Sequence, residues 1–185
     1  IFGHTIFVAS TDGFVYAFSL DGKLLWKFNS GNSIEASPMV AENKVIIGNL
    51  EGNVFAIDIK SGKEVWKYTT DGQVNGSVNS VITTKETLVL IPSYDFALHC
   101  VHLKTGKPVW KCPTSNYLNG TPSTDNKIAV IGGCDSKIHL IDIGSGKEKD
   151  SIQAGTYIAE SAALWGDMAF VGDYNGIFTG VNISE

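Results

Sequence analysis

The sequence predicts an all-β protein built from repeated units of about forty residues, each a four-stranded antiparallel sheet. The dipeptide Gly-Lys recurs at intervals of 40, 44 and 40 residues, starting at Gly22, Gly62, Gly106 and Gly146. Short apolar or alternating runs are separated by turn residues along the chain, and no window of about a dozen residues has a helical period. A repeat of this length indicates an array of identical supersecondary units.

The second unit shows the strand pattern most clearly. Its strands are expected over 34–41, 45–49, 54–59 and 64–69. Turns are expected at Glu51-Gly52 and Ser61-Gly62, where glycine adopts a positive φ at low cost. A repeated unit of four antiparallel strands and about 40 residues is typical of a β-propeller blade.

Tryptophan is the second repeating feature. It stands four residues after three of the four repeated glycines, at Trp26, Trp66 and Trp110. The preceding strand of each of these units carries a small residue in register with the indole, namely Ala17, Ala56 and Cys100. A large indole lying across a small neighbour would cover the gap between blades. The fourth unit departs at both positions, with Leu140 and Asp150.

The blade boundaries follow from these markers. A single partial propeller of about four and a half blades is expected over 1–185. The expected blades are 1–30, which has only the three outer strands, then the complete blades 34–70, 74–113 and 117–153, and finally 157–185, which has only the three inner strands. The extra residues of the third unit fall in 83–87. Three strands at each end predict a segment of a seven- or eight-bladed ring, with a turn glycine after Glu185 and a tryptophan four residues beyond it. A closed five-bladed ring is the alternative.

Composition excludes two classes of partner. The chain has 185 residues, and 14 basic against 19 acidic side chains give a net charge of −5. Nucleic acid and anionic lipid surfaces require a basic excess, which this chain lacks. Its longest apolar runs are far shorter than the roughly 20 residues that cross a bilayer, so no membrane insertion is expected.

One family resemblance follows from the tryptophan motif. The stretch from Ala56 to Trp66 reads Ala-x-Asp-x-x-Ser-Gly-x-x-x-Trp, and 17–26 and 100–110 are variants of it. This pattern resembles the pyrroloquinoline-quinone-type (PQQ-like) propeller repeat with its tryptophan-docking motif. The resemblance implies a quinoprotein-like β-propeller, and it favours a periplasmic or secreted location. The family includes quinone-dependent dehydrogenases and many non-catalytic propellers, and this chain is closest in character to the latter.

Polar residues at the start of each innermost strand are the candidate binding site. Glu35, Asn75 and Asn119 each stand two residues before a hydroxyl residue, and strand alternation predicts that these residues share a face at the channel mouth. Their oxygens suit a calcium ion or a quinone site. The alternative interpretation is a solvated channel with no dedicated ligand.

Cysteine and histidine indicate no further site. Three cysteines without CxxC spacing predict neither a zinc site nor a disulfide framework. Cys100 and Cys112 flank one hairpin, either bridged or, as the favoured reading, free and buried. His99 and His139 occupy equivalent positions in adjacent units and are interpreted as interblade or surface histidines.

These observations lead to two functional hypotheses. The favoured one is a non-catalytic propeller scaffold that presents rim and channel-mouth loops to a protein or peptide partner, within a larger propeller or multidomain chain, with no cofactor. The alternative is the scaffold portion of a PQQ-dependent dehydrogenase, with calcium and the quinone near Glu35, Asn75 and Asn119. Calcium-dependent uptake of the quinone distinguishes them.

Overall fold

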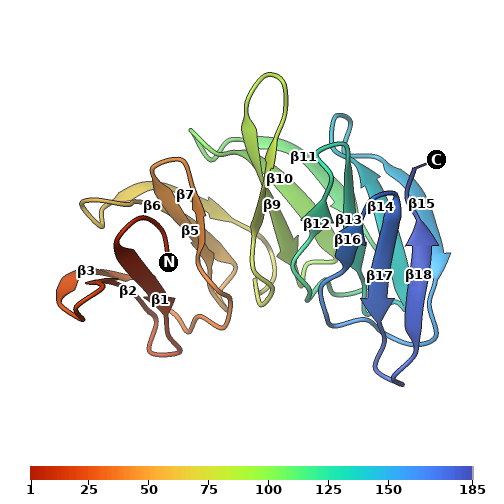
Figure 1. Ribbon diagram of the computed structural model, residues 1–185, viewed down its shortest axis with the longest axis horizontal. Coiled ribbons are helices and arrows are strands. Elements are labelled where there is room, and N and C mark those ends of the chain that lie inside the picture. The colour runs from red at the N-terminus through yellow and green to blue at the C-terminus, as the bar shows by residue number, and fades with distance from the viewer. Residues whose placement is uncertain (185) are drawn as a thin grey trace.

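The computed structural model describes residues 1–184 and consists of five antiparallel sheets that follow one another along the chain (Figure 1). The strands are β1 (Thr5–Ala9), β2 (Phe14–Ser19), β3 (Leu24–Asn29), β4 (Met39–Ala41), β5 (Lys44–Gly48), β6 (Asn53–Asp58), β7 (Glu64–Thr69), β8 (Asn79–Ile82), β9 (Thr87–Ser93), β10 (Ala97–His102), β11 (Pro108–Pro113), β12 (Ser123–Thr124), β13 (Ile128–Gly132), β14 (Lys137–Asp142), β15 (Glu148–Gln153), β16 (Ala163–Trp165), β17 (Met168–Gly172) and β18 (Phe178–Asn182). The all-β prediction is confirmed. Over the described residues, the structure contains no helix with the length and apolarity needed to span a lipid bilayer.

Each sheet is a meander whose strand order follows the sequence. The first and last sheets have three strands and the middle three have four. The innermost strands of neighbouring sheets contact each other, β4 with β8 and β12 with β16. The hairpin between β8 and β9 has a four-residue loop, 83–86, at the position where the sequence places its insertion.

The innermost strands are shorter than the sequence suggested. The expectation of a strand over 34–41 was wrong, because β4 includes only Met39–Ala41 and residues 34–38 are irregular. Pro38 has no N–H to give to a ladder. The backbone N–H of Ser37 instead donates to the Ser77 hydroxyl of the next sheet, at 2.9 Å.

Apolar side chains fill the spaces between the sheets. Buried residues form four clusters, one between each pair of neighbouring sheets. Within β5, Val45 and Ile47 belong to the cluster shared with the first sheet, while Ile46 belongs to the cluster shared with the third. A strand covered on both faces carries apolar side chains on both faces, which explains the continuous run of Val45, Ile46 and Ile47 within β5.

Three tryptophans join neighbouring sheets. Within its own sheet, each tryptophan pairs with the small residue that the sequence predicts: Trp26 with Ala17, Trp66 with Ala56 and Trp110 with Cys100. Each indole N–H also donates to a backbone carbonyl of the next sheet. The acceptors for Trp26, Trp66 and Trp110 are Ile59, Leu103 and Ile143 respectively. The indoles also lie against the next repeated glycine. A Cβ at Gly106 would approach the indole of Trp66 to 2.7 Å, and Gly106 has a φ of +67°. The repeated glycine therefore serves both the turn and the docking of the preceding indole.

The fourth sheet lacks this contact. Leu140 pairs with Asp150, so the larger aliphatic side chain stands opposite an exposed carboxylate instead of an indole. Leu140 is itself buried in the cluster shared with the fifth sheet.

Candidate functional site

One edge of the five sheets carries the predicted site residues. Two sets of connections meet at this edge. The first set is the loops that link successive sheets, residues 30–38, 70–78, 114–122 and 154–162. The second set is one hairpin turn from each sheet: 49–52, 94–96 and 133–136 between the second and third strands of the four-stranded sheets, and the equivalent turns 10–13 and 173–177 of the two terminal sheets. Backbone hydrogen bonds join them, from Tyr94 to Gln73 and from Cys134 to Tyr117, both at 2.9 Å. We call these nine segments the mouth face.

The three predicted site residues lie on this face but do not form one ring. The Asn75 amide donates to the Glu35 carboxylate at 3.2 Å. The Asn119 carbonyl accepts from the Tyr94 hydroxyl at 3.1 Å, and its amide donates to the backbone carbonyl of Ala159 at 3.4 Å. Every one of these bonds links different sheets or the loops between them. Glu35 and Asn75 are brought together, whereas Asn119 has separate partners.

The hydroxyl residues bridge the same sheets. The backbone N–H of Ser37 donates to the Ser77 hydroxyl, and the N–H of Thr121 donates to the Ser161 hydroxyl, both at 2.9 Å. Each of these bonds joins two residues 40 positions apart in the sequence. They satisfy backbone N–H groups that the shortened innermost strands leave unpaired. This contact between sheets explains the hydroxyl at Ser77 and at Ser161.

One polar atom of the site is left without a partner. The Asn75 carbonyl oxygen is buried and accepts no hydrogen bond. At the equivalent position of the next sheet, Asn119 is satisfied by Tyr94, but Leu50 occupies the place of that tyrosine in the second sheet. This role of Tyr94 is not evident from the sequence, because it depends on how the turns and loops of different sheets are placed relative to one another.

The site residues do not fit the quinone that the family resemblance implies. Pyrroloquinoline quinone is a tricarboxylate and needs cations around it. The nine segments of the mouth face contain no basic side chain, and Glu35 is itself an anion already bonded to Asn75. Residues 1–184 also contain no cluster of three or more His, Cys, Asp or Glu suited to a metal ion.

Aromatic side chains gather on the mouth face. Tyr94 and Tyr117 have ring centroids 4.5 Å apart, and Phe96 lies 5.0 Å from Tyr117. Tyr157 and Tyr174 form a second, stacked pair at 4.5 Å. These residues were not among the predicted site residues. The sequence feature that indicates them is the 40-residue spacing of Tyr117 and Tyr157, which places both tyrosines at equivalent positions in adjacent units.

His99 belongs to a buried network between the second and third sheets. Its Nε2 lies 3.0 Å from both Asp95 carboxylate oxygens, and its Nδ1 lies 2.9 Å from the Tyr68 hydroxyl. Burial lowers the pKa of His99, although Asp95 acts against this shift. Burial also opposes ionisation of Asp95, but hydrogen bonds from Lys111 and His99 outweigh it and hold the Asp95 pKa below its usual value. The imidazole is 2% exposed, so this network is structural.

His139 is the equivalent residue in the fourth sheet and is also buried. Its Nε2 lies 3.1 Å from Asp135, and its Nδ1 lies 2.6 Å from Glu148. Of the two predicted locations for these histidines, interblade or surface, the surface is therefore excluded, because both side chains are buried.

All three cysteines are free. Burial raises the pKa of Cys100 to about 12, and burial also raises the pKa values of Cys112 and Cys134. Because the thiolate is the reactive form, none of them is activated as a nucleophile at neutral pH.

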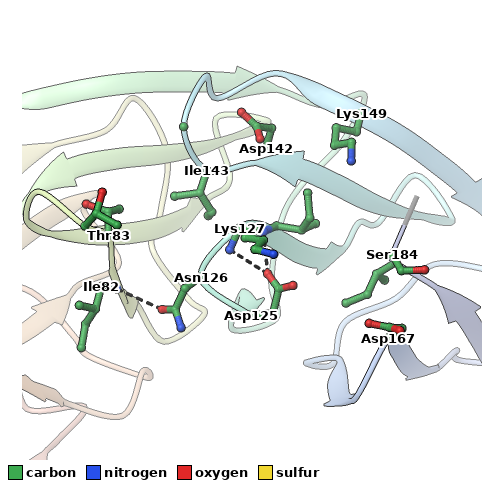
Figure 2. Close-up of a pocket in the computed structure, with 14 residues that line it drawn as sticks. Ile82, Thr83, Asp125, Asn126, Lys127, Asp142, Ile143, Lys149, Asp167 and Ser184 are labelled. Atoms are coloured by element: carbon green, nitrogen blue, oxygen red, sulfur yellow. Dashed lines mark hydrogen bonds between the residues drawn. The ribbon is translucent and has the colours of Figure 1, made fainter.

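A cavity of about 700 Å³ lies at the opposite edge of the sheets (Figure 2). Its lining comes from the hairpins after β8 and β12, the turn after β14, and Asp167, Ile183 and Ser184. Two of its carboxylates cap turns: Asp125 accepts from the N–H groups of 127 and 128, and Asp142 accepts from Ser145. Lys127, Lys149 and Asp167 remain as charged groups, which is not a convergent catalytic arrangement.

Two solved structures resemble the chain over almost its whole length. BamB from Moraxella catarrhalis matches with a TM-score of 0.82 and 20% identity, covering 98% of this chain and 58% of that one. The computationally designed Ika8 protein matches with a TM-score of 0.87 and 16% identity, covering 99% and 57%. These likenesses establish the β-propeller fold, and the chain spans less than two thirds of either structure.

Sequence comparison identifies the family. Tetrathionate hydrolase of Acidithiobacillus ferrooxidans is 39% identical over 57 residues, which are 31% of this chain and 11% of that protein. Outer membrane protein assembly factor BamB of Burkholderia pseudomallei is 32% identical over 66 residues, 36% and 17% of the two chains. A family model described as outer membrane protein assembly factor BamB matches residues 2–154 and 51–185. The chain therefore belongs to this family of PQQ-like β-propeller repeat proteins.

Proposed function

We propose that the protein is a non-catalytic β-propeller module whose rim and mouth face bind a protein or peptide partner. The observation that carries this proposal is the exposure of aromatic side chains on the mouth face: Phe96 and Tyr117 are each 43% exposed, Tyr157 39% and Tyr174 70%. Exposed clusters of large aromatic residues mark interaction sites in proteins. Polar groups of Ser77, Asn119 and Ser161 on the same face bond between neighbouring sheets, which supports a binding role over a catalytic one.

The family name is consistent with this role. The matching family model and one curated relative are described as an assembly factor of outer membrane proteins. On that basis we also propose an extracytoplasmic location, which fractionation of cells that produce the natural full-length protein would test. Recovery in the cytosolic fraction would contradict it.

Selection of a random peptide library on the immobilised protein tests the binding role. Hydrogen exchange then locates the amides that a selected peptide protects. Protection in the mouth-face loops is expected, together with loss of binding in Ser115→Arg, which places a bulky side chain at an exposed mouth-face position. Thr84→Arg, at an exposed position of the opposite edge, is the matched control. Selection of no peptide, or protection confined to the opposite edge, would refute the proposal.

A further inference from the structure

Charge is divided unevenly between the two edges of the sheets. The nine mouth-face segments contain eight carboxylates and no lysine, arginine or histidine; the acids are Asp12, Glu35, Glu51, Asp71, Asp95, Asp135, Glu160 and Asp173. The eight loops at the opposite edge contain eight lysines and five carboxylates, over 20–23, 42–43, 59–63, 83–86, 103–107, 125–127, 143–147 and 166–167. A face lined by one sign of charge raises the local concentration of ligands of the opposite sign.

Only some of these carboxylates are available to a ligand. Asp95 and Asp135 are nearly buried and are bonded to histidines. In contrast, Glu35, Asp71 and Glu160 are exposed, although one Glu35 oxygen accepts from the Asn75 amide, and they lie in three different loops between sheets. The free negative charge is thus spread over several sheets and is not concentrated at one point.

The aromatic pairs lie among these carboxylates. Tyr94, Tyr157 and Tyr174 occur in loops and turns that carry these acids, whereas Tyr117 lies in loop 114–122, which has no acid, and its ring packs against that of Tyr94, the residue before Asp95. Burial raises the pKa of the Tyr94 hydroxyl, and the charge of Glu35 adds to this shift. Tyrosine rings attract ammonium and guanidinium groups through their faces, most strongly where negative charge is also close.

We propose that the mouth face binds a lysine- or arginine-rich segment of a partner protein in an extended conformation. Cationic side chains would lie against the rings of Tyr117 and Tyr157 and near Glu35, Asp71 and Glu160. Residues 1–184 contain no group of three or more His, Cys, Asp or Glu that could hold a metal ion, so one small cation does not account for the three exposed carboxylates, whereas an extended chain can contact several loops. This inference rests on the proposed function and specifies the chemistry of the partner.

Fluorescence anisotropy of a labelled oligolysine peptide tests the inference, with oligoglutamate as the negative probe. Oligolysine is expected to bind, and the double variant Tyr117→Leu/Tyr157→Leu to weaken it about fivefold. Tyr117→Phe/Tyr157→Phe keeps both rings and is expected to bind normally. The variant Asp71→Asn/Glu160→Gln is expected to weaken binding about tenfold at low ionic strength. Thermal melts of every variant establish that the fold is retained.

The control for net charge is Glu42→Gln/Asp167→Asn, which removes the same two charges from the opposite edge. Equal weakening by this control would overturn the inference, because it would show attraction to the overall charge alone. If tetramethylammonium displaces the labelled oligolysine as effectively as unlabelled oligolysine does, the site binds a single cation and the inference of an extended basic segment is overturned. If library selection instead recovers mouth-face peptides without basic residues, the binding role stands and the basic partner is refuted.

Discussion

The indole N–H of Trp66 donates a hydrogen bond of 2.8 Å to the backbone carbonyl of Leu103, across the boundary between the second and third sheets. The same ring lies on Gly106 and opposite Ala56. One side chain therefore joins its own sheet to the next, and the motif repeats at Trp26 and Trp110.

Removing this indole should destabilise the array. Trp66 is 7% exposed, so Trp66→Ala leaves a cavity and an unpaired carbonyl, and we expect a loss of about 3 kcal/mol or more in unfolding free energy. Chemical denaturation measures this loss. Trp165→Ala is the control because Trp165 is 79% exposed. Equal effects of the two substitutions would contradict the docking role of Trp66.

The repeated glycine provides a second test. Gly106→Ala introduces both a strained positive φ and a clash with the indole of Trp66. Gly22→Ala has the same type of strain, with φ at +85°, but its Cβ meets nothing within 4 Å. We expect Gly22→Ala to cost about 1 kcal/mol and Gly106→Ala clearly more. Equal unfolding free energies for the two variants would show that the indole contact contributes nothing.

The unpartnered oxygen of Asn75 predicts a stabilising substitution. Leu50→Tyr places a hydroxyl where Tyr94 provides one for Asn119. A restored hydrogen bond should raise the melting temperature by stabilising the fold by about 1 kcal/mol. Leu50→Phe adds the ring without the hydroxyl and should give no comparable gain. A gain in both variants would indicate ring packing as the cause.

The buried His99 predicts a pH dependence of stability. Burial lowers its pKa below the ordinary value of 6.5, so below that pH the unfolded chain binds a proton that the folded chain does not yet bind. Unfolding free energy should therefore fall as pH drops below 6.5. The Asp95 contribution is lost only at lower pH, below the ordinary value of 3.8 for its carboxyl group.

Denaturation of His99→Gln between neutral pH and pH 5 is the measurement, and a flatter profile than that of the unmodified protein is expected. His102→Gln is the comparison, since the His102 side chain is 33% exposed. A profile unchanged by His99→Gln would assign the pH dependence to other groups.

The charge of the mouth face predicts no uptake of pyrroloquinoline quinone. Adding the quinone with calcium should leave its absorbance spectrum unchanged, because the nine mouth-face segments contain no basic side chain to hold the three carboxylates and Lys111, which reaches this face from β11, is already paired with Asp95. Calcium-dependent uptake that Asn119→Ala abolishes would restore the dehydrogenase hypothesis.

The sequence determined the architecture of the sheets. The 40-residue period, the turn glycines and the pairs of tryptophan with a small residue all act locally or between adjacent strands, so they can be read along the chain. Residues 34–38 were misassigned because their backbone bonds go to another sheet, through Ser37 and Ser77.

Only the tertiary structure decided what the surface presents. The contact of Tyr94 with Asn119 and the grouping of exposed tyrosines depend on how loops from different sheets meet at one edge. The separation of eight carboxylates from eight lysines has the same origin, because alternate connections of an antiparallel meander lie at opposite edges. Repetition along the chain specifies each sheet, whereas the register between neighbouring sheets decides which side chains share a face.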